Sequence, residues 1–189
     1  MQITRQIVFV GRLSYEKGVD ALIDAFMLAQ EHGELRGYDL AIIGNGPLMG
    51  KLKGTINKAY GQRIRFEGFL NSVSVIEQLK RSAIAVLPSV CYENAPMSIV
   101  EAIYCENLLA VTNHGGMKEF ASMFPTVKTF EYSRNKLVFA SNILKTPVDI
   151  DYHYDEISKY KAESKQQLSV LCDPLMYCTE LNRVYNGYA

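Results

Sequence analysis

Short apolar runs recur along the chain, and each ends in a turn or a polar loop. Residues 7–10 and 40–43 are continuous apolar runs that stop at Gly11 and Gly44. Runs of this length, bounded by turn residues, are typical of strands buried on both faces. Similar runs occupy residues 84–87 and 108–111, and weaker strands are indicated at 63–66 and 127–130. The pattern predicts six strands.

Between these runs the apolar spacing becomes helical. Val19, Leu22, Ile23 and Phe26 fall on one face of a helix that follows the first strand. Further helices are predicted over Leu48, Leu52, Ile56 and Ala59, over residues 74–81, from Ala95 with Ile99, Ala102 and Ile103 inward, and over 118–122. Strands that alternate with helices through short loops predict an α/β fold, a Rossmann-like, doubly wound parallel sheet with helices on both faces.

The chain changes character after this alternation. From Ser133 it is polar and helical in spacing, and rich in Lys, Glu, Gln and Tyr. We therefore divide it into a Rossmann-like domain, residues 1–150, and a C-terminal helical segment, residues 151–189, that packs on it. The first residues lead directly into a strand, as expected of a domain taken from a longer protein.

Composition narrows the choice of partners. Twenty basic and twenty acidic side chains cancel, so no broad field attracts nucleic acid. The four cysteines include no CxxC pair and the three histidines are scattered, which favours reduced cysteines in a cytosolic protein over a zinc site. No apolar run approaches the roughly 18 residues of a membrane span, and no signal peptide is visible. We expect a cytoplasmic protein without a bound metal.

Ligands of such sheets lie beyond the carboxyl ends of the strands, so the loops there matter most. In the first loop Gly11 permits a sharp turn, and Arg12 and Lys17 flank the start of the following helix. A helix N-terminus attracts anions, and two cations beside it favour a diphosphate. The alternative is that Arg12 pairs with a surface carboxylate and Lys17 is solvated.

The loop after the fourth strand offers another anion site. Asn94 can cap the next helix and Pro96 suits its first turn. The backbone amides of Ala95, Met97 and Ser98 then point toward the crevice.

Two carboxylates accompany this loop. Glu93 precedes the cap, and Glu101 lies on the helix, where it can accept hydrogen bonds from a vicinal diol such as a ribose. The alternative for Glu101 is an exposed helix residue or a capping box with Ser98.

The turn after the second strand is not a dinucleotide fingerprint. Gly44, Gly46 and Gly50 give the spacing G-x-G-x-x-x-G, with a proline at position 47, and the turn follows the second strand instead of the first. This disfavours a nicotinamide-dependent dehydrogenase. We interpret Asn45 and Gly46 as part of a tight turn that lines the crevice. No P-loop, HExxH or GxSxG stretch is present.

Together these loops resemble the signature of the family 4 retaining glycosyltransferases. The matching stretches are GRL with KG (residues 11–13 and 17–18), GNGP (44–47), FEG (66–68), PS with E-x7-EA (88–89 and 93–102) and GG-x-x-E (115–119). They occur in order on the predicted loops and cover residues 8 to about 120. After residue 120 the expected pattern is not evident.

The resemblance implies one half of a GT-B fold, in which two Rossmann-like domains face each other across a cleft. It implies that Arg12 and Lys17 neutralise the donor diphosphate in place of a metal ion, that Glu101 binds the ribose hydroxyls, and that Glu93 lies near the donor sugar. The backbone at Phe69 and Leu70 would recognise the base. Four residues, Ala95, Pro96, Met97 and Ser98, would contact phosphate or sugar. No cofactor is expected, and no clear nucleophile is visible.

The function expected from the resemblance is transfer of a hexose from a UDP- or GDP-linked donor, with retention of configuration. The ENxPMS variant of the motif suggests bacterial surface polysaccharide synthesis. The N-terminal acceptor domain lies outside this chain, so the chain alone would bind donor and transfer little. The acceptor would be lipid-linked or a saccharide, with the full protein cytoplasmic or peripheral at the inner face of the membrane. Alternatives are a GT-B-type UDP-sugar epimerase and a nucleotide-binding module without catalysis.

Overall fold

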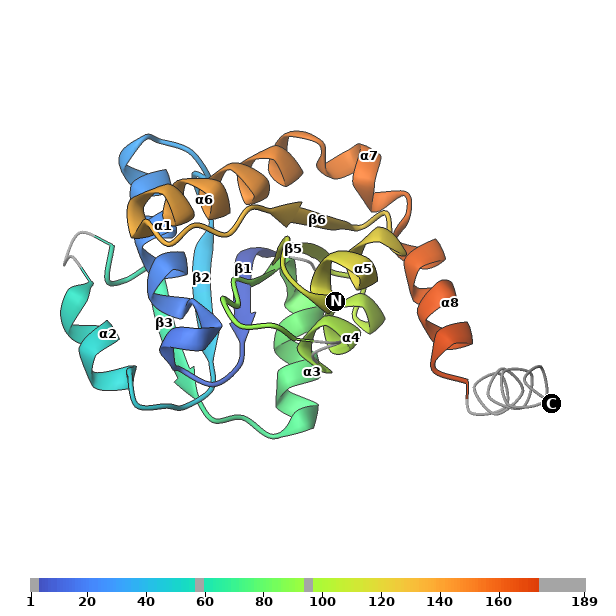
Figure 1. The fold of residues 1–189 in the computed structure, drawn as a ribbon, viewed down its shortest axis with the longest axis horizontal. Coiled ribbons are helices and arrows are strands. Elements are labelled where there is room, and N and C mark those ends of the chain that lie inside the picture. The colour runs from blue at the N-terminus through green and yellow to red at the C-terminus, as the bar shows by residue number, and fades with distance from the viewer. Residues whose placement is uncertain (1–3, 57–59, 94–96, 174–189) are drawn as a thin grey trace.

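The computed structural model describes residues 4–56, 60–93 and 97–173 and contains one six-stranded sheet (Figure 1). The strands are β1 (Thr4–Val10), β2 (Asp39–Ile43), β3 (Ile64–Gly68), β4 (Ser82–Leu87), β5 (Leu108–Thr112) and β6 (Val127–Phe130). Their order is β3-β2-β1-β4-β5-β6, and every neighbouring pair is parallel. The predicted doubly wound, Rossmann-like fold is confirmed.

Helices cover both faces of the sheet. They are the 3-10 turn η1 (Tyr15–Lys17), α1 (Val19–Glu31), α2 (Met49–Thr55), α3 (Ser72–Arg81), α4 (Met97–Tyr104), α5 (Gly116–Ser122), α6 (Lys136–Tyr152), α7 (Tyr154–Ser158) and α8 (Lys161–Leu171). Successive residues of a strand point to opposite faces. Ile7 and Phe9 accordingly join the core under α1 and α6, while Val8 joins the core under α3, α4 and α5.

The polar tail adds to both cores. Helix α6 packs along α1, and α8 packs against α4 on the other face (Figure 1). Ile143 and Ile150 of α6 are fully buried in the first core, and Leu168 of α8 is buried in the second. Helix α6 continues past residue 150 to Tyr152, so the proposed division of the chain at 150 remains a prediction.

The prediction for α2 was wrong at its end. Its helical spacing was expected to include Ile56 and Ala59, but α2 ends at Thr55 and Ile56 is extended, with φ −73° and ψ 122°. Ala59 lies outside the described residues. Ile56 still packs against the first core from this extended position, because burial of its side chain does not require helical backbone.

Candidate functional site

The loops after β1, β2 and β3 interlock through their backbones. The amide of Gly11 donates to the Ile43 carbonyl at 3.0 Å, and that of Leu13 donates to the Asn45 carbonyl at 2.9 Å. A side chain on Gly44 would overlap the carbonyl oxygen of Gly11, and one on Gly46 would overlap the backbone of Leu13. The glycines of the predicted turn therefore serve close packing between loops.

The β1 and β4 loops are joined in the same way. The amide of Val90 donates to the carbonyl of Glu16 at 2.8 Å. Gly18 immediately precedes α1 as its N-cap residue, with φ 65°, and a side chain there would overlap the carbonyl of Pro88. This close approach brings together Lys17 and Glu93, which are 76 positions apart in the sequence.

Lys17 and Glu93 form an ion pair, with Nζ 2.8 Å from Oε1. The two side chains are 29% and 13% exposed. The Ser89 hydroxyl also hydrogen-bonds to Glu93, and the Cys91 Sγ lies 3.7 Å from its Oε1. Burial alone would raise the pKa of Glu93, but the hydrogen bonds from Lys17 and Ser89 and the charge of Lys17 outweigh it and lower the pKa. Glu93 is therefore an oriented, ionised carboxylate.

Arg12 lies on the same loop as Lys17 and is exposed. Within the part of the chain that the structure describes, its side chain forms no ion pair, so the predicted alternative of a paired surface carboxylate is not observed. The pKa of Glu16 is lowered mainly by a hydrogen bond from Ser14, at 2.6 Å, with smaller contributions from the charges of Arg12 and Lys17. Both cations are thus close enough to act on one carboxylate.

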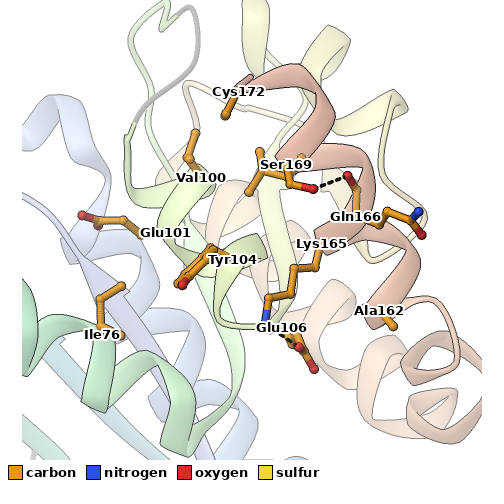
Figure 2. Close-up of a pocket in the computed structure, with 11 residues that line it drawn as sticks. Ile76, Val100, Glu101, Tyr104, Glu106, Ala162, Lys165, Gln166, Ser169 and Cys172 are labelled. Carbon is orange, nitrogen blue, oxygen red and sulfur yellow. Dashed lines mark hydrogen bonds and ion pairs between the residues drawn. The ribbon is translucent and has the colours of Figure 1, made fainter. Parts of the chain in front are cut away.

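Glu101 lies on α4 and is half-buried. Burial raises the pKa of its carboxyl group, and among the described residues this carboxyl group has no hydrogen-bond or ion-pair partner. In Figure 2 its side chain extends from α4 toward the side of Ile76 and away from Lys165. It lines one margin of a groove of about 650 Å³ between α4 and α8, a groove that Lys17 and Glu93 do not line. A carboxylate in this state has its full capacity to accept hydrogen bonds.

The remaining predicted residues lie around these groups. Phe69 follows β3 and is 77% exposed, whereas Leu70 packs against the second core. Met97 begins α4 with an exposed side chain, and Ser98 is half-buried. Asn94, Ala95 and Pro96 lie outside the described residues, so the predicted cap and most of the amide cradle stay predictions.

The sequence interpretation missed contacts made by Ser89, Tyr92 and His114. Ser89 is buried and bonded to Glu93, and the ring of Tyr92 stacks on that of His114 with centroids 4.1 Å apart. Ser89 belongs to the PS motif, which was a usable signal. His114 had none, because its neighbour in space is 22 positions away in the sequence.

The described residues lack two features, a metal-binding cluster and a membrane-spanning helix. No cluster of three or more His, Cys, Asp or Glu side chains suited to a metal ion occurs among residues 4–56, 60–93 and 97–173. In the same ranges, no helix has the length and apolar character needed to cross a membrane.

Comparison with known proteins identifies the family. The profile of the glycosyl transferases group 1 family matches residues 4–142, which include all six strands and all the loops described above. The chain therefore belongs to the group 1 glycosyltransferases.

Its relatives are longer than this chain. An uncharacterised glycosyltransferase of Methanocaldococcus jannaschii is 30% identical over 116 residues, which are 61% of this chain and 29% of that protein. A glycogen synthase of Mycobacterium tuberculosis is 35% identical over 119 residues, 60% of this chain and 27% of that protein. The matched parts span less than a third of these curated relatives.

Solved structures share the fold at lower identity. Anabaena HepE in complex with UDP and glucose superposes with a TM-score of 0.76 at 17% identity, over 97% of this chain and 48% of that one. The catalytic domain of the cholesterol-alpha-glucosyltransferase of Helicobacter pylori gives 0.68 at 22% identity, over 86% of this chain and 96% of that one. The chain spans about half the length of HepE. The two superpositions show that the chain has the Rossmann-like fold found in GT-B glycosyltransferases.

Proposed function

We propose that this chain is the donor-binding half of a glycosyltransferase and that its β1 and β4 loops bind the diphosphate of a nucleotide sugar. The observation that carries the proposal is the Lys17–Glu93 ion pair, at 2.8 Å, beside an exposed Arg12 without an ion-pair partner among the described residues. Two cations next to a helix start, one of them held by an ion pair, favour binding of a pyrophosphate.

The same cations would assist the chemistry. As the bond between the anomeric carbon and the diphosphate breaks, negative charge accumulates on the departing phosphate oxygens. Lys17 and Arg12 would stabilise that charge without a metal ion. Glu93 would orient the donor sugar or stabilise the positive charge that develops at its anomeric carbon. The acceptor hydroxyl would give its proton to the departing diphosphate on the same face of the sugar, which retains the configuration.

The other half of the donor would lie toward α4. Glu101 has an unused capacity to accept hydrogen bonds, which suits the ribose hydroxyls. The backbone at Phe69 and Leu70 would contact the base, and the amides of Met97 and Ser98 would contact phosphate or sugar. We propose a UDP- or GDP-linked hexose as donor, since HepE binds UDP and glucose and a Mycobacterium tuberculosis relative is GDP-mannose-dependent.

The acceptor would be bound by a second domain. HepE is about twice as long as this chain, which supports a two-domain enzyme in which residues 1–189 transfer little by themselves. A role in bacterial surface polysaccharide synthesis, a cytoplasmic setting and peripheral attachment to the membrane are the wider expectations of this proposal.

Isothermal titration of the chain with UDP and with GDP, in the presence of a chelator, tests the proposal. We expect a dissociation constant in the micromolar-to-millimolar range for at least one nucleotide. Arg12→Ala should weaken binding about tenfold, as expected for one charge-assisted hydrogen bond. Lys80→Ala, at an exposed position of α3, is the matched control and should change nothing.

Two results would contradict the proposal. The first is that neither nucleotide binds. The second is that nucleotide binds equally well to wild type and to Arg12→Ala, which would place the ligand elsewhere. Conversion of a UDP-sugar by the full-length protein without any acceptor would instead indicate an epimerase.

A further inference from the structure

An aromatic side chain without an assigned role stands next to the Lys17–Glu93 pair. Tyr92 immediately precedes Glu93 on the β4 loop and is 80% exposed. A tyrosine ring carries a large apolar area, so exposing it contributes little to folding. Its exposed position beside Glu93 indicates that the ring is available to contact a ligand.

The ring of Tyr92 is nevertheless fixed. It stacks on His114 with centroids 4.1 Å apart and an interplanar angle of 34°. The rings of His114 and Tyr132 are 5.6 Å apart, and Tyr132 makes an edge-to-face contact with Phe139 of α6 at 5.3 Å. We call these four side chains the aromatic column. It begins in the packed core at Phe139 and reaches the surface at Tyr92.

The loop after β5 also supports this ring. Gly115 has φ 57°, and a side chain there would come within 2.9 Å of the Tyr92 ring. Only glycine lets the backbone lie this close in that conformation. Tyr92 is therefore supported by His114 and Gly115 on one side and open to solvent on the other.

A fixed aromatic face beside a carboxylate has a defined chemical complement. The face of the ring is electron-rich and attracts groups with a slight positive charge, such as the C–H groups of a saturated ring. The ionised carboxylate of Glu93 accepts hydrogen bonds from hydroxyl groups. A pyranose carries both kinds of group, with C–H bonds on its faces and hydroxyls around its rim.

We propose that Tyr92 stacks on the hexose ring of the nucleotide-sugar donor and that His114 is a positioning residue for it. This inference rests on the proposed function, because it places the hexose beside Glu93. It adds a binding residue for the sugar, distinct from the groups that bind the diphosphate.

The test compares a sugar nucleotide with the nucleotide alone. UDP-glucose, GDP-mannose, UDP and GDP are titrated into wild type, Tyr92→Ala and Tyr92→Phe. Tyr92→Ala should bind the preferred sugar nucleotide about twofold to tenfold more weakly and bind the free nucleotide as wild type does. Tyr92→Phe keeps the ring and should retain both affinities. His114→Ala should reduce only the affinity for the sugar nucleotide, and by less than Tyr92→Ala.

The outcomes separate the two proposals. Equal weakening of nucleotide and sugar nucleotide in Tyr92→Ala would mean that the ring contacts the base or the diphosphate, and no weakening of either would mean that it contacts neither. Both results overturn this inference and leave the proposed function intact. Absence of nucleotide binding by wild type would overturn both.

The chain contains no tryptophan, which allows a direct optical test. Tyr92→Trp keeps an aromatic face and introduces the sole indole. Its fluorescence should change when the sugar nucleotide displaces the bound nucleotide. Tyr160→Trp, at a 47% exposed position where α8 begins, should show no change. Equal emission of the Tyr92→Trp variant with both ligands would count against stacking.

Discussion

Glu93 and Glu101 belong to one motif and lie eight positions apart, but their carboxyl pKa values are shifted in opposite directions. Glu93 receives hydrogen bonds from Lys17 and Ser89, and its pKa is lowered. The side chain of Glu101 has no hydrogen-bond or ion-pair partner among the described residues, and burial raises its pKa. One side of the site is thus organised by the protein before a ligand arrives. The other side retains a desolvated acceptor that a ligand can satisfy.

This difference has an energetic meaning. Paired charges stabilise the fold, whereas a partly buried charge without a partner costs stability. The Glu93 side should therefore respond to mutation in both stability and binding, and the Glu101 side in binding alone. The predictions that follow test this contrast.

The largest effect is expected where the organised side is built. Gly18→Ala would place a side chain on the Pro88 carbonyl at a left-handed position, and we expect a loss of about 3 kcal/mol of unfolding free energy. The melting temperature should fall by roughly 6–12 °C. Gly50→Ala is the control, because its added methyl meets nothing within 4 Å. Equal melting temperatures for the two variants would contradict the close packing of the β1 and β4 loops.

Removing the cation of the organised side should affect binding most. Lys17→Met should weaken nucleoside diphosphate binding roughly tenfold to hundredfold, since the proposed charge-assisted hydrogen bond to phosphate would be lost. Lys136→Met removes another ion-paired lysine, one bonded to Asp24 at 2.7 Å, and should leave affinity unchanged. Calorimetric titration of both variants measures the difference. Similar affinities would show that Lys17 serves the fold alone.

Glu93→Gln should reduce stability in a pH-dependent way. At neutral pH we expect a loss of about 1–2 kcal/mol, because Lys17 keeps its charge without its partner. A carboxylate with a lowered pKa contributes stability above its ordinary pKa and loses that contribution as pH falls through the lowered value. Urea unfolding from neutral pH down to about pH 2 should therefore show a constant difference above the ordinary pKa and convergence of wild type and variant below it. A difference that stays constant to the lowest pH would exclude ionisation as the cause.

Glu101→Gln should change stability least. A carboxylate with a raised pKa destabilises the fold above that pKa, and the penalty disappears as pH falls and the group is protonated. The variant should equal wild type or exceed it by less than about 0.5 kcal/mol at neutral pH. Nucleotide affinity should still fall about fivefold, because glutamine keeps only one of the two oxygens that we propose accept from the ribose hydroxyls. A marked loss of stability would reveal a structural partner for Glu101.

The layered fold could be predicted from local patterns because four of the six strands contain a continuous apolar run and helical spacing lies between them. Both faces of the sheet are covered, so residues such as Val8 and Phe9 are buried although they point in opposite directions. The end of α2 could not be predicted, because Ile56 reaches the core from extended backbone. Apolar spacing reports burial, and burial alone does not fix the backbone conformation.

The loops of the candidate site were easier to predict than the contacts between them. Glycines and charges after the strands pointed to loops that the structure brings together, since the carboxyl ends of parallel strands share one edge. The pairing of Lys17 with Glu93 depends on β1 lying beside β4, and the stacking of Tyr92 on His114 depends on two loops meeting. Neither neighbour is specified by the local sequence.

The central place of β1 bears on how the chain folds as it is synthesised. β1 pairs with β2 on one side and with β4 on the other. The three-stranded unit of β3, β2 and β1 is complete once residue 68 has been made, but one side of β1 then stays unpaired until residues 82–87 follow. During that interval an apolar strand edge is exposed to other chains. Slow translation between residues 68 and 82 should therefore favour aggregation of nascent chains over correct folding.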